Sequence, residues 1–441
     1  MRLSGPDPIR RAIVERTVLV TGATGFLGQE LLFQLLTTTD ANVICLVRAG
    51  KSTTARHRVE EIAVELFGPA GWAALGGRVS ALRGDLTQPD LGLGVRARHA
   101  LADRVTHVVH GAASVRFDHP LSAARRINVQ GTVAMLDLAA ELQLRGRLQR
   151  FAYVSTAFVS GRHPAWFAED DLEVGQAFRN SYERSKFEAE LEVRARMRAL
   201  PCTVVRPSIV VGNSRSGATT SFNVIYWPLR AYADGMLRYA PSSPNLPVDV
   251  VPVDFVARGV VAAVLQGDAG ETYALAAGAR ATQACDIGDM AARVFVTRPP
   301  RFSPPPLPRF IEPLVSPLLG IGPWKRFGSA VRQYLPYFLY GSRFDTTHAD
   351  ALLRPRGIEP PPANEFLEPV LEFARNTDFG RDRAAIEAQE QVLTNDRLRV
   401  LQRASARSRA SARAGSHPPS TRGRRRQNRT SRTTPPGAPV R

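Results

Sequence analysis

The sequence predicts an α/β fold built on a doubly wound parallel sheet. Two observations predict it. A short β-branched run at 17–20 leads through a glycine-rich loop at 21–28 into apolar residues at helical spacing over 29–36. Strand-like apolar runs then alternate with helical patterns through the first half of the chain, as in a parallel sheet with right-handed crossovers. The expected architecture is therefore of the Rossmann type, with a smaller C-terminal part and a disordered basic tail.

The loop at 21–28 has the spacing GxxGxxG and stands between a buried strand and a helix. In that context glycines allow a tight turn and a close approach of the backbone to a pyrophosphate. The loop N–H groups and the positive end of the helix then face the anion. A glycine-rich turn without a ligand is the alternative, which the context disfavours. The residues expected to hold a dinucleotide are Gly22, Thr24, Gly25, Phe26, Leu27 and Gly28.

Arg48 stands directly after the second predicted strand, 43–47. An acidic residue near this position would bind the ribose hydroxyl of NAD, whereas an arginine suits the 2′-phosphate of NADP. Arg48 therefore predicts NADPH as the cofactor; a solvated arginine at a strand end is the alternative. Arg56 and Arg58 could assist, but a solvated helix face explains them better.

Further apolar runs continue the predicted sheet. They lie at 79–82, 105–109, 151–156 and 202–207, and the run at 248–253 is expected as a seventh strand. In an open parallel sheet ligands bind at the carboxyl ends of the strands. Side chains that follow these runs are therefore candidates for the site.

Several residues next to these strand ends are expected near the cofactor. Asp85 would reach the adenine amino edge or else close a turn. Asn128 begins an apolar-periodic helix, as a cap or as a proton-relay residue. His110, at a strand end, is assigned a structural role. The expected set also includes Leu86, Ala112 and Pro207.

Tyr182 and Lys186 stand four residues apart, so a helix places both side chains on one face. A phenol has a pKa near ~10, and a lysine cation beside it should favour the phenolate and lower that pKa. Thr156, with Ser155 beside it, supplies a hydroxyl that can hold a carbonyl group and stabilise an oxyanion. YxxxK alone is weak evidence. After the glycine loop and the Ser-Thr strand end, it predicts Thr156, Tyr182 and Lys186 as a catalytic set, with Tyr182 and Lys186 also near the cofactor.

Positive charge is concentrated at the C-terminal end. The formal net charge is +18, and residues 397–441 contain thirteen arginines with no lysine or acid, which leaves +5 for the remainder. Such a stretch cannot bury enough apolar surface to fold, so a disordered extension is expected. Binding of nucleic acid or anionic lipid is the alternative, and the lack of interleaved aromatic residues disfavours nucleic acid.

The three cysteines, Cys45, Cys202 and Cys285, lie far apart without a CxxC pair. This argues against a disulfide framework or a zinc site and fits a reducing compartment; no metal is expected. The N-terminal residues lack a signal-peptide pattern, and no run reaches the ~18 apolar residues of a membrane span. A cytoplasmic protein is expected, with peripheral membrane association as an open alternative.

These motifs carry a resemblance to extended short-chain dehydrogenases/reductases. Among them, the chain looks like the fatty acyl-CoA reductase and thioester reductase group, which has a male-sterility-type NAD-binding domain. The resemblance fades after about residue 268. Its motifs are TGATGFLG (21–28), CLVRA (45–49), GDL (84–86), HGAASVRFD (110–118), NVQGT (128–132), YVSTAFV (153–159), SYERSK (181–186), RPSIVVG (206–212) and VPVDFVA (251–257).

The resemblance implies NADPH-dependent reduction of a fatty acyl-CoA or a related acyl thioester to an aldehyde, which a second hydride could take to the alcohol. It implies Thr156, Tyr182 and Lys186 as the catalytic residues. Since no adenylation or carrier domain precedes the reductase motifs, a substrate on free coenzyme A or on a separate carrier protein is expected. Two alternatives stay open. One is another extended member, a sugar-nucleotide epimerase/dehydratase or a hydroxysteroid-type dehydrogenase; the other is a non-catalytic NADP-binding regulator.

The predicted domains are a nucleotide-binding domain at 1–267, to which 212–247 adds part of the substrate site, and a substrate-binding part at 268–381. A charged helix and the basic tail follow at 382–441. Segment 301–340 is apolar, proline-rich and aromatic. It could line an acyl channel or contact a membrane surface, and ordinary helical core is an equal alternative.

Overall fold

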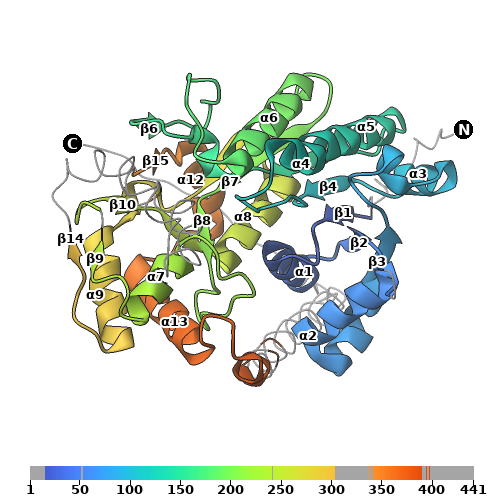
Figure 1. Cartoon of the computed structure of the whole chain (residues 1–441). Coiled ribbons are helices and arrows are strands. Elements are labelled where there is room, and N and C mark those ends of the chain that lie inside the picture. The colour runs from blue at the N-terminus through green and yellow to red at the C-terminus, as the bar shows by residue number, and fades with distance from the viewer. Residues whose placement is uncertain are drawn as a thin grey trace, which may run out of the picture. The chain divides into compact units, whose positions relative to one another are not determined.

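The structure, a computed structural model, describes residues 15–50, 53–240, 242–302, 341–389 and the single residues 337, 394 and 397. All of them belong to one compact unit, Met1–Leu398; the second unit, Arg399–Arg441, lies outside the described residues. At the centre of the first unit is a parallel sheet of seven strands (Figure 1). Its strands are β1 (Thr17–Thr21), β2 (Asn42–Val47), β3 (Val79–Arg83), β4 (His107–His110), β5 (Arg150–Val154), β7 (Cys202–Pro207) and β12 (Thr272–Leu275).

Six of these strands lie where the sequence predicts them, and the seventh does not. The prediction of a central strand at 248–253 is wrong, because β11 (Val250–Pro252) pairs only with the short β8 (Ile209–Val211), outside the central sheet. The edge position beside β7 is taken by β12, which follows helix α8 (Val253–Gln266). A short apolar run looks the same in a central or a peripheral strand, so pattern alone could not separate the two. The domain boundary after residue 267 stays a prediction.

β1 occupies the point where the chain changes direction across the sheet. The strand order is β12-β7-β5-β4-β1-β2-β3, so the chain runs outward from β1 to β3 and returns to β4 on the other side of β1. In open α/β sheets a crevice for ligands lies at this switch point, beyond the carboxyl ends of the strands. A Cβ at Gly22, just after β1, would lie 2.8 Å from the backbone nitrogen of Ala112, just after β4. The two chain segments therefore meet at the predicted cofactor site.

Helices cover both faces of the sheet (Figure 1). Helices α5 and α6 lie on one face, with α3 beside α5, while α1 and α8 pack together on the other, with α2 beside α1. This is the doubly wound arrangement that the alternating pattern predicts. The bounds are α1 (Phe26–Thr38), α2 (Ala55–Leu75), α3 (Val95–Ala102), α5 (Gly131–Leu144) and α6 (Ser181–Arg196).

An apolar core forms where the sheet meets α5 and α6. Leu19 of β1, Val108 of β4 and Phe151 of β5 pack there, together with Leu136 of α5 and Val193 of α6. Helices on both faces bury inner strands such as β1 and β7 along their whole length, so their sequences are nearly continuous apolar runs, whereas the edge strand β3 is only partly buried. This burial fixes the sheet and, with it, the positions of the residues that follow each strand.

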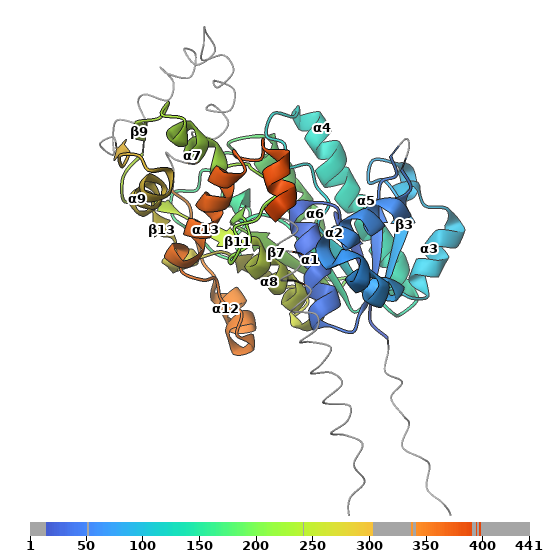
Figure 2. The same cartoon turned by 90° about the horizontal axis from the view of Figure 1, so that it is seen from below.

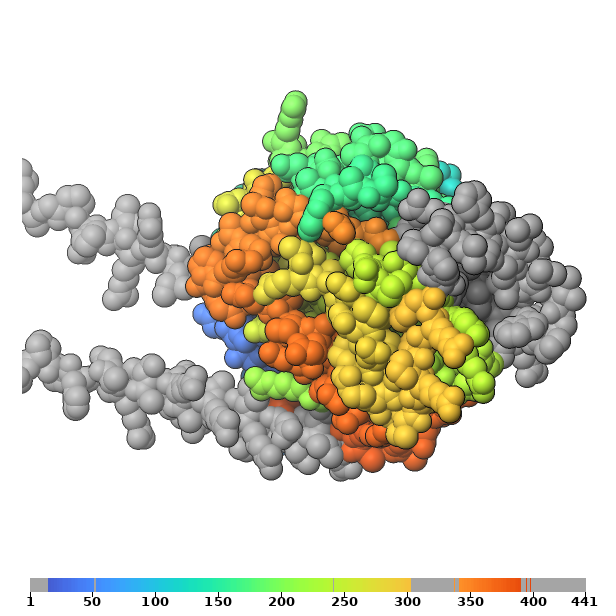
Figure 3. Space-filling view, turned by 90° about the vertical axis from the view of Figure 1, so that its left-hand side faces the viewer, coloured from blue at the N-terminus to red at the C-terminus, as the bar shows by residue number. Residues whose placement is uncertain are grey.

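A second apolar cluster lies beside the sheet and is built from later parts of the chain. It joins Tyr226 of α7 (Tyr226–Ala233), Ile287 of α9 (Ala284–Phe295) and Phe366 of α13 (Ala363–Asn376). Helices α9 and α13 are neighbours in Figure 2, and their yellow and orange side chains adjoin on the surface in Figure 3. Residues from both sides of the predicted domain boundary contribute to this cluster.

Two predicted segments fall mostly outside the described residues. Of segment 301–340 the structure describes only 301–302 and 337, and of segment 382–441 only 382–389, 394 and 397. The acyl-channel hypothesis and the disordered tail therefore stay predictions. Arg397 is described, and it pairs with Glu30 of α1 at 3.3 Å. Within the described part of the chain, no helix is both long enough and apolar enough to cross a membrane.

Candidate active site

A cleft of about 850 Å³ lies at the switch point of the sheet. Residues that follow β1 to β5 and β7 line it, together with Ser221, Asn223 and Val224 from the chain before α7 and with Tyr337. Every predicted catalytic and cofactor-binding residue lines this cleft except Asn128, which lies behind its wall. The sheet therefore brings together residues that are spread over almost two hundred positions of sequence.

The loop between β1 and α1 is shaped to receive a pyrophosphate. Gly22 has a φ of +79°, a conformation that favours glycine, and a Cβ at Gly28 would lie only 2.0 Å from the Gly22 carbonyl oxygen. Helix α1 begins after Gly25, and no side chain caps its first turn. The N–H groups of that turn and the positive end of the helix are therefore available to an anion in the cleft. Together with Thr24, Phe26 and Leu27, which also line the cleft, these residues fit the NAD(P) cofactor that the sequence predicts.

Two arginines line the cleft beyond the end of β2. Arg48 is exposed, and Arg58 of α2 lies beside it, donating from Nη1 to the Arg48 carbonyl oxygen at 2.6 Å. Arg56 is different: it pairs with Glu60 at 2.8 Å on the exposed side of α2. Of the two arginines, Arg58 is therefore the one that could assist Arg48, because the first turn of α2 turns it toward the end of β2. Both guanidinium groups could bind a 2′-phosphate.

Asp85 closes the turn after β3. Its Oδ1 accepts from the backbone nitrogen of Thr87 at 2.9 Å and from the Thr87 hydroxyl at 2.8 Å. Asp85 also lines the cleft, so a contact with adenine stays a prediction beside its role in the turn. Leu86, Ala112 and Pro207 line the same cleft at the ends of β3, β4 and β7.

Asn128 lies in a π-helical turn, Arg126–Gln130, that leads into α5, and its side chain is 1% exposed. Its Oδ1 accepts from the Ser114 backbone nitrogen at 2.7 Å, and its Nδ2 donates to the Ser114 carbonyl at 3.1 Å and to the Ser185 hydroxyl at 2.9 Å. The side chain therefore does not cap a helix. It clamps the loop after β4 to α6, the helix that carries Tyr182. π-Helical turns of this kind are frequent at functional sites.

Tyr182, Lys186 and Thr156 come together in the cleft. Tyr182 and Lys186 share one face of α6, as their spacing predicts, and the Thr156 hydroxyl, two residues after β5, lies close enough to the Tyr182 phenol to lower its pKa. Within the protein this hydroxyl accepts from the Phe158 backbone nitrogen at 3.3 Å and donates to the Pro207 carbonyl at 3.4 Å. The Lys186 ammonium donates to the Val154 carbonyl at 2.7 Å and lies 4.1 Å from the centre of the Tyr153 ring. A carbonyl oxygen placed against Tyr182 and Thr156 would therefore meet two hydroxyl donors.

Burial controls the protonation of these groups. It raises the pKa of Tyr182 to about 12, against the smaller effect of the Thr156 hydroxyl. It lowers the pKa of Lys186 to about 7, and the carboxylate of Glu190 acts in the opposite direction. The expectation that Lys186 brings the pKa of Tyr182 down is therefore wrong for this arrangement, because burial of the phenol dominates. At neutral pH Tyr182 is a neutral phenol, which can donate a proton.

Ser155 and Thr156 have different partners. The Ser155 hydroxyl donates to Glu190 at 2.6 Å, and Arg206 pairs with the same carboxylate at 2.6 Å. Glu190 and Arg206 are almost completely buried, and Arg206 also donates to backbone carbonyl groups, including that of Asp171. Ser155 thus belongs to a buried structural network, whereas Thr156 lies beside Tyr182 and influences the pKa of its phenol.

Sequence reasoning missed an aromatic group on the wall of the cleft, formed by Phe117, Phe158 and Tyr337. The Phe117 ring is stacked between Tyr182 and Tyr337, at centroid distances of 5.6 and 5.7 Å. Phe117 and Phe158 lie within the motifs HGAASVRFD and YVSTAFV, so the local sequence did contain a signal for them. Tyr337 lies well beyond the region of family resemblance, in segment 301–340, whose aromatic composition suggested a channel without singling out this residue.

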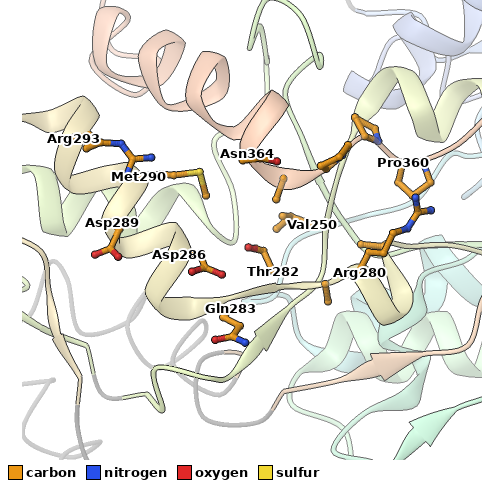
Figure 4. A pocket seen from close by; sticks show the side chains of 15 residues that line it. Val250, Arg280, Thr282, Gln283, Asp286, Asp289, Met290, Arg293, Pro360 and Asn364 are labelled. Carbon is orange, nitrogen blue, oxygen red and sulfur yellow. The ribbon is translucent and has the colours of Figure 1, made fainter.

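A second pocket, of about 600 Å³, lies between the starts of α9 and α13 (Figure 4). Charges of both signs line it: Arg280 and Arg293 together with Asp286 and Asp289. Arg280 is paired with Glu359 at 3.3 Å. This pocket contains neither the tyrosine–lysine pair nor the glycine loop, so the candidate chemistry belongs to the cleft at the switch point.

Comparison with known proteins places this fold and site in a family. The profile of the male sterility protein family matches residues 20–260, more than half of the chain. Nonribosomal peptide synthetase asaC of Aspergillus flavus is 32% identical over 271 residues, covering 59% of this chain and 26% of that protein. Fatty acyl-CoA reductase wat of Drosophila melanogaster is 28% identical over 292 residues, covering 58% of this chain and 55% of that protein. The chain thus spans between about a quarter and about half of the length of these relatives.

Solved structures agree with this match. The terminal R domain from the myxalamid PKS-NRPS biosynthetic pathway has a TM-score of 0.70 at 28% identity, over 83% of this chain and 92% of that one. The reductase (R) domain of a nonribosomal peptide synthetase from Mycobacterium tuberculosis shares the fold, with a TM-score of 0.61 at 24% identity over 83% of this chain and 92% of that one. From the family match, the sheet order and the glycine loop at the switch point, the chain belongs to the male sterility protein family of NAD(P)-binding domains, within the extended short-chain dehydrogenases/reductases.

Proposed function

We propose that the chain is an NADPH-dependent reductase that converts an acyl thioester, carried on coenzyme A or on a carrier protein, into an aldehyde. The observation that carries this proposal is that Thr156, Tyr182 and Lys186 line the same cleft as the glycine loop, with Tyr182 one helical turn before Lys186. The substrate class is supported by relatives named as a fatty acyl-CoA reductase and as reductase domains of peptide synthetases.

The choice of NADPH over NADH rests on the two arginines beyond β2. Arg48 and Arg58 both line the cleft, and Arg58 donates a hydrogen bond to the Arg48 carbonyl oxygen. The residue directly after the strand is thus an arginine, where an NAD-binding site would have an acidic residue. A guanidinium group binds a phosphate through parallel hydrogen bonds and favours the extra 2′-phosphate of NADPH. Gly22, Gly25 and Gly28 would hold the pyrophosphate.

The reaction follows from the placement of the hydroxyl groups. Bound NADPH supplies the hydride that the acyl carbon receives. As that carbon becomes tetrahedral, negative charge develops on its oxygen, where the hydroxyls of Thr156 and Tyr182 stabilise it. Tyr182 gives its proton to this oxygen, and Lys186, partly charged at neutral pH, favours the phenolate that remains. The resulting hemithioacetal expels the thiol and leaves the aldehyde.

A substrate screen with product analysis tests this function. The purified chain is incubated with NADPH and with acyl-CoA thioesters of increasing length or with acylated carrier protein, and NADPH oxidation, aldehyde and alcohol are measured. We expect thioester-dependent oxidation with release of one thiol per aldehyde. Absence of turnover with every thioester would overturn the proposal, and turnover of UDP-sugars or hydroxysteroids would instead assign the chain to another activity of the extended reductases.

Tyr182→Phe tests the assignment of the proton donor. We expect it to lower turnover by at least about 10²-fold while NADPH binding stays within about twofold, because only the transferable proton is removed. Tyr232→Phe is a matched control, since the Tyr232 hydroxyl is also hydrogen-bonded, to the Arg298 carbonyl, but lies outside the cleft. Unchanged turnover in Tyr182→Phe would remove Tyr182 from the mechanism.

A further inference from the structure

Tyr337 lies next to the catalytic residues although it comes from the C-terminal part of the chain. Its side chain is 8% exposed and lines the active-site cleft. We propose that Tyr337 is a positioning residue for Tyr182: it fixes the first turn of α6 through its hydroxyl, and it supports the Phe117 ring that packs on the catalytic phenol. This inference rests on the proposed function in one respect, the role of Tyr182 as proton donor.

The hydroxyl group of Tyr337 makes two hydrogen bonds at the start of α6. It donates to Glu183 Oε1 at 2.6 Å and accepts from Asn180 Nδ2 at 3.0 Å. Asn180 is the N-cap of α6, and its Oδ1 accepts from the Glu183 backbone nitrogen at 2.9 Å. Glu183 in turn reaches back to the Arg179 backbone nitrogen at 2.9 Å. Tyr337 therefore bridges the N-cap side chain of α6 and the Glu183 side chain, which reaches back to the residue before the cap, and Tyr182 lies between them in the sequence.

The ring of Tyr337 belongs to an aromatic stack that includes Tyr182. Phe117 is stacked on Tyr182 with an interplanar angle of 26°, and Tyr337 is stacked on Phe117 with an angle of 17°. The edge of Phe158 packs against Tyr337 at 5.1 Å. Aromatic pairs at these separations stabilise their mutual orientation. The ring of Tyr337 is therefore the outer support of a three-ring stack whose inner ring is the catalytic phenol.

Tyr337 also contacts a buried ion pair beside Tyr182. Arg179 and Glu183 form an ion pair at 3.1 Å whose side chains are 1% and 0% exposed, and the Arg179 guanidinium lies 5.0 Å from the Tyr337 ring. Arg179 also donates to the Ser342 hydroxyl at 3.3 Å. A buried carboxylate needs its hydrogen-bond donors, so loss of the Tyr337 hydroxyl leaves Glu183 incompletely paired. The C-terminal part is thus fastened at Tyr337 and Ser342 to the residues that flank Tyr182.

These contacts predict an effect on the chemical step rather than on cofactor binding. Within the described residues, the ring and hydroxyl contacts of Tyr337 are with the aromatic group and with residues 179–183, not with the glycine loop. A displacement of a catalytic group by ~1 Å can cost about 10²-fold in rate. Tyr337 acts on the reaction through Tyr182 and needs no contact with the reacting atoms.

The experiment compares Tyr337→Phe, Tyr337→Leu and the control Tyr232→Phe, each in the full chain. Steady-state kinetics with the best thioester give kcat and both KM values, and NADPH deuterated at the transferred position gives the primary isotope effect. For Tyr337→Leu we expect kcat to fall by about 10- to 100-fold, with the NADPH dissociation constant within about twofold and a larger isotope effect. Tyr337→Phe keeps the ring and should recover most of kcat, while Tyr232→Phe should match the wild type.

Hydrogen exchange of residues 181–185 supplies a readout that needs no substrate. Tyr337→Phe should speed exchange in this first turn of α6, because its cap loses a partner, whereas Tyr232→Phe should not. Unchanged kcat and isotope effect in a folded Tyr337→Leu, or unchanged exchange in Tyr337→Phe, would overturn the inference. If the wild type turns over no thioester, the proposed function fails, and the exchange measurement still decides whether Tyr337 holds the end of α6. If Tyr337→Leu does not fold, the isosteric Tyr337→Phe decides by the same exchange.

Discussion

The Lys186 ammonium donates a hydrogen bond to the Val154 carbonyl at 2.7 Å. This bond ties α6 to the end of β5, the strand that delivers Thr156 two residues later. Lys186 is 3% exposed, and desolvation holds its pKa at about 7 rather than the 10.5 of an exposed lysine. The residue that ties α6 to β5 therefore changes charge near neutral pH.

We expect kcat/KM to fall as the pH rises through about 7, because the ammonium that favours a Tyr182 phenolate is then lost. Lys186→Met should lower kcat/KM at pH 6.5 by about 10²-fold or more and remove this fall. The pH–rate profiles of the two proteins check it. Arg184→Met is the control, because Arg184 is exposed on the same helix and pairs with Glu188 at 2.7 Å. A profile for Lys186→Met that still bends near pH 7 would assign the ionisation to another group.

The same pKa shift predicts how stability depends on pH. In the unfolded chain Lys186 binds a proton up to about 10.5, whereas in the folded chain it releases it above about 7. Between these values the unfolded state binds more protons, so this group makes the free energy of unfolding rise with pH over that window. Denaturant unfolding at pH 7 and pH 9.5 should show a smaller rise for Lys186→Met than for the wild type. An identical rise in both proteins would mean that Lys186 is charged in the folded state.

Arg48 should decide between the two nicotinamide cofactors. Loss of a charged hydrogen-bond donor to phosphate costs about 1.5–3 kcal/mol, which corresponds to roughly 10- to 150-fold in affinity. Arg48→Ala should therefore raise the KM for NADPH by that factor and leave the KM for NADH nearly unchanged. Arg56→Ala is the matched control, since Arg56 is exposed on α2 and paired with Glu60. Parallel losses for both cofactors in Arg48→Ala would contradict a contact with the 2′-phosphate.

The sequence predicts the local parts of this site well, for a physical reason. The glycine loop and the Tyr182–Lys186 pair depend on short spacings within one turn or one helix, so residue order alone determines their geometry. Asn128 and Tyr337 differ, since their roles depend on contacts with Ser185 and with Glu183, which are far away in the sequence. Such contacts are set by how separate elements pack.

The protonation states of Tyr182 and Lys186 could not be predicted from the sequence either. Placing Lys186 one turn from Tyr182 suggested a lowered phenol pKa, because proximity is visible in the spacing. Burial is not visible there. The packing of α6 against the sheet desolvates both groups, and this effect outweighs their mutual influence. The residue types were predictable, whereas the sign of the pKa shift required the fold.

Alanine substitutions at Gly28 and Gly25 should have separate effects, the first on stability and the second on cofactor binding. A Cβ at Gly28 would lie 2.0 Å from the Gly22 carbonyl oxygen, so Gly28→Ala forces the backbone apart and should cost about 1–3 kcal/mol of unfolding free energy. At Gly25 a Cβ would lie 3.3 Å from the Gly22 carbonyl oxygen and the φ is −87°, so an alanine requires a shift of only a few tenths of an ångström. Gly25→Ala should keep the stability within about 0.5 kcal/mol of the wild type yet weaken NADPH binding, because its methyl group lies where the pyrophosphate approaches.

Denaturant unfolding and fluorescence titration with NADPH measure these two effects. Wild-type affinity in Gly25→Ala would show that the pyrophosphate does not approach this glycine. Wild-type stability in Gly28→Ala would show that the loop relaxes more easily than its close packing indicates.

Substitutions of Ser155 and Thr156 should affect stability and kcat differently, because these two adjacent hydroxyls face different partners. Ser155 donates to buried Glu190, so Ser155→Ala leaves a carboxylate short of one donor and should cost about 1–3 kcal/mol of stability, with kcat within a few fold of the wild type. Thr156 lies beside the Tyr182 phenol in the cleft, so Thr156→Ala should lower kcat by about 10²–10³-fold, the typical cost of one oxyanion donor. Unfolding curves and kcat for both variants check this. If Ser155→Ala loses as much kcat as Thr156→Ala, the two hydroxyls share the substrate oxygen and the buried network around Glu190 is part of the catalytic machinery.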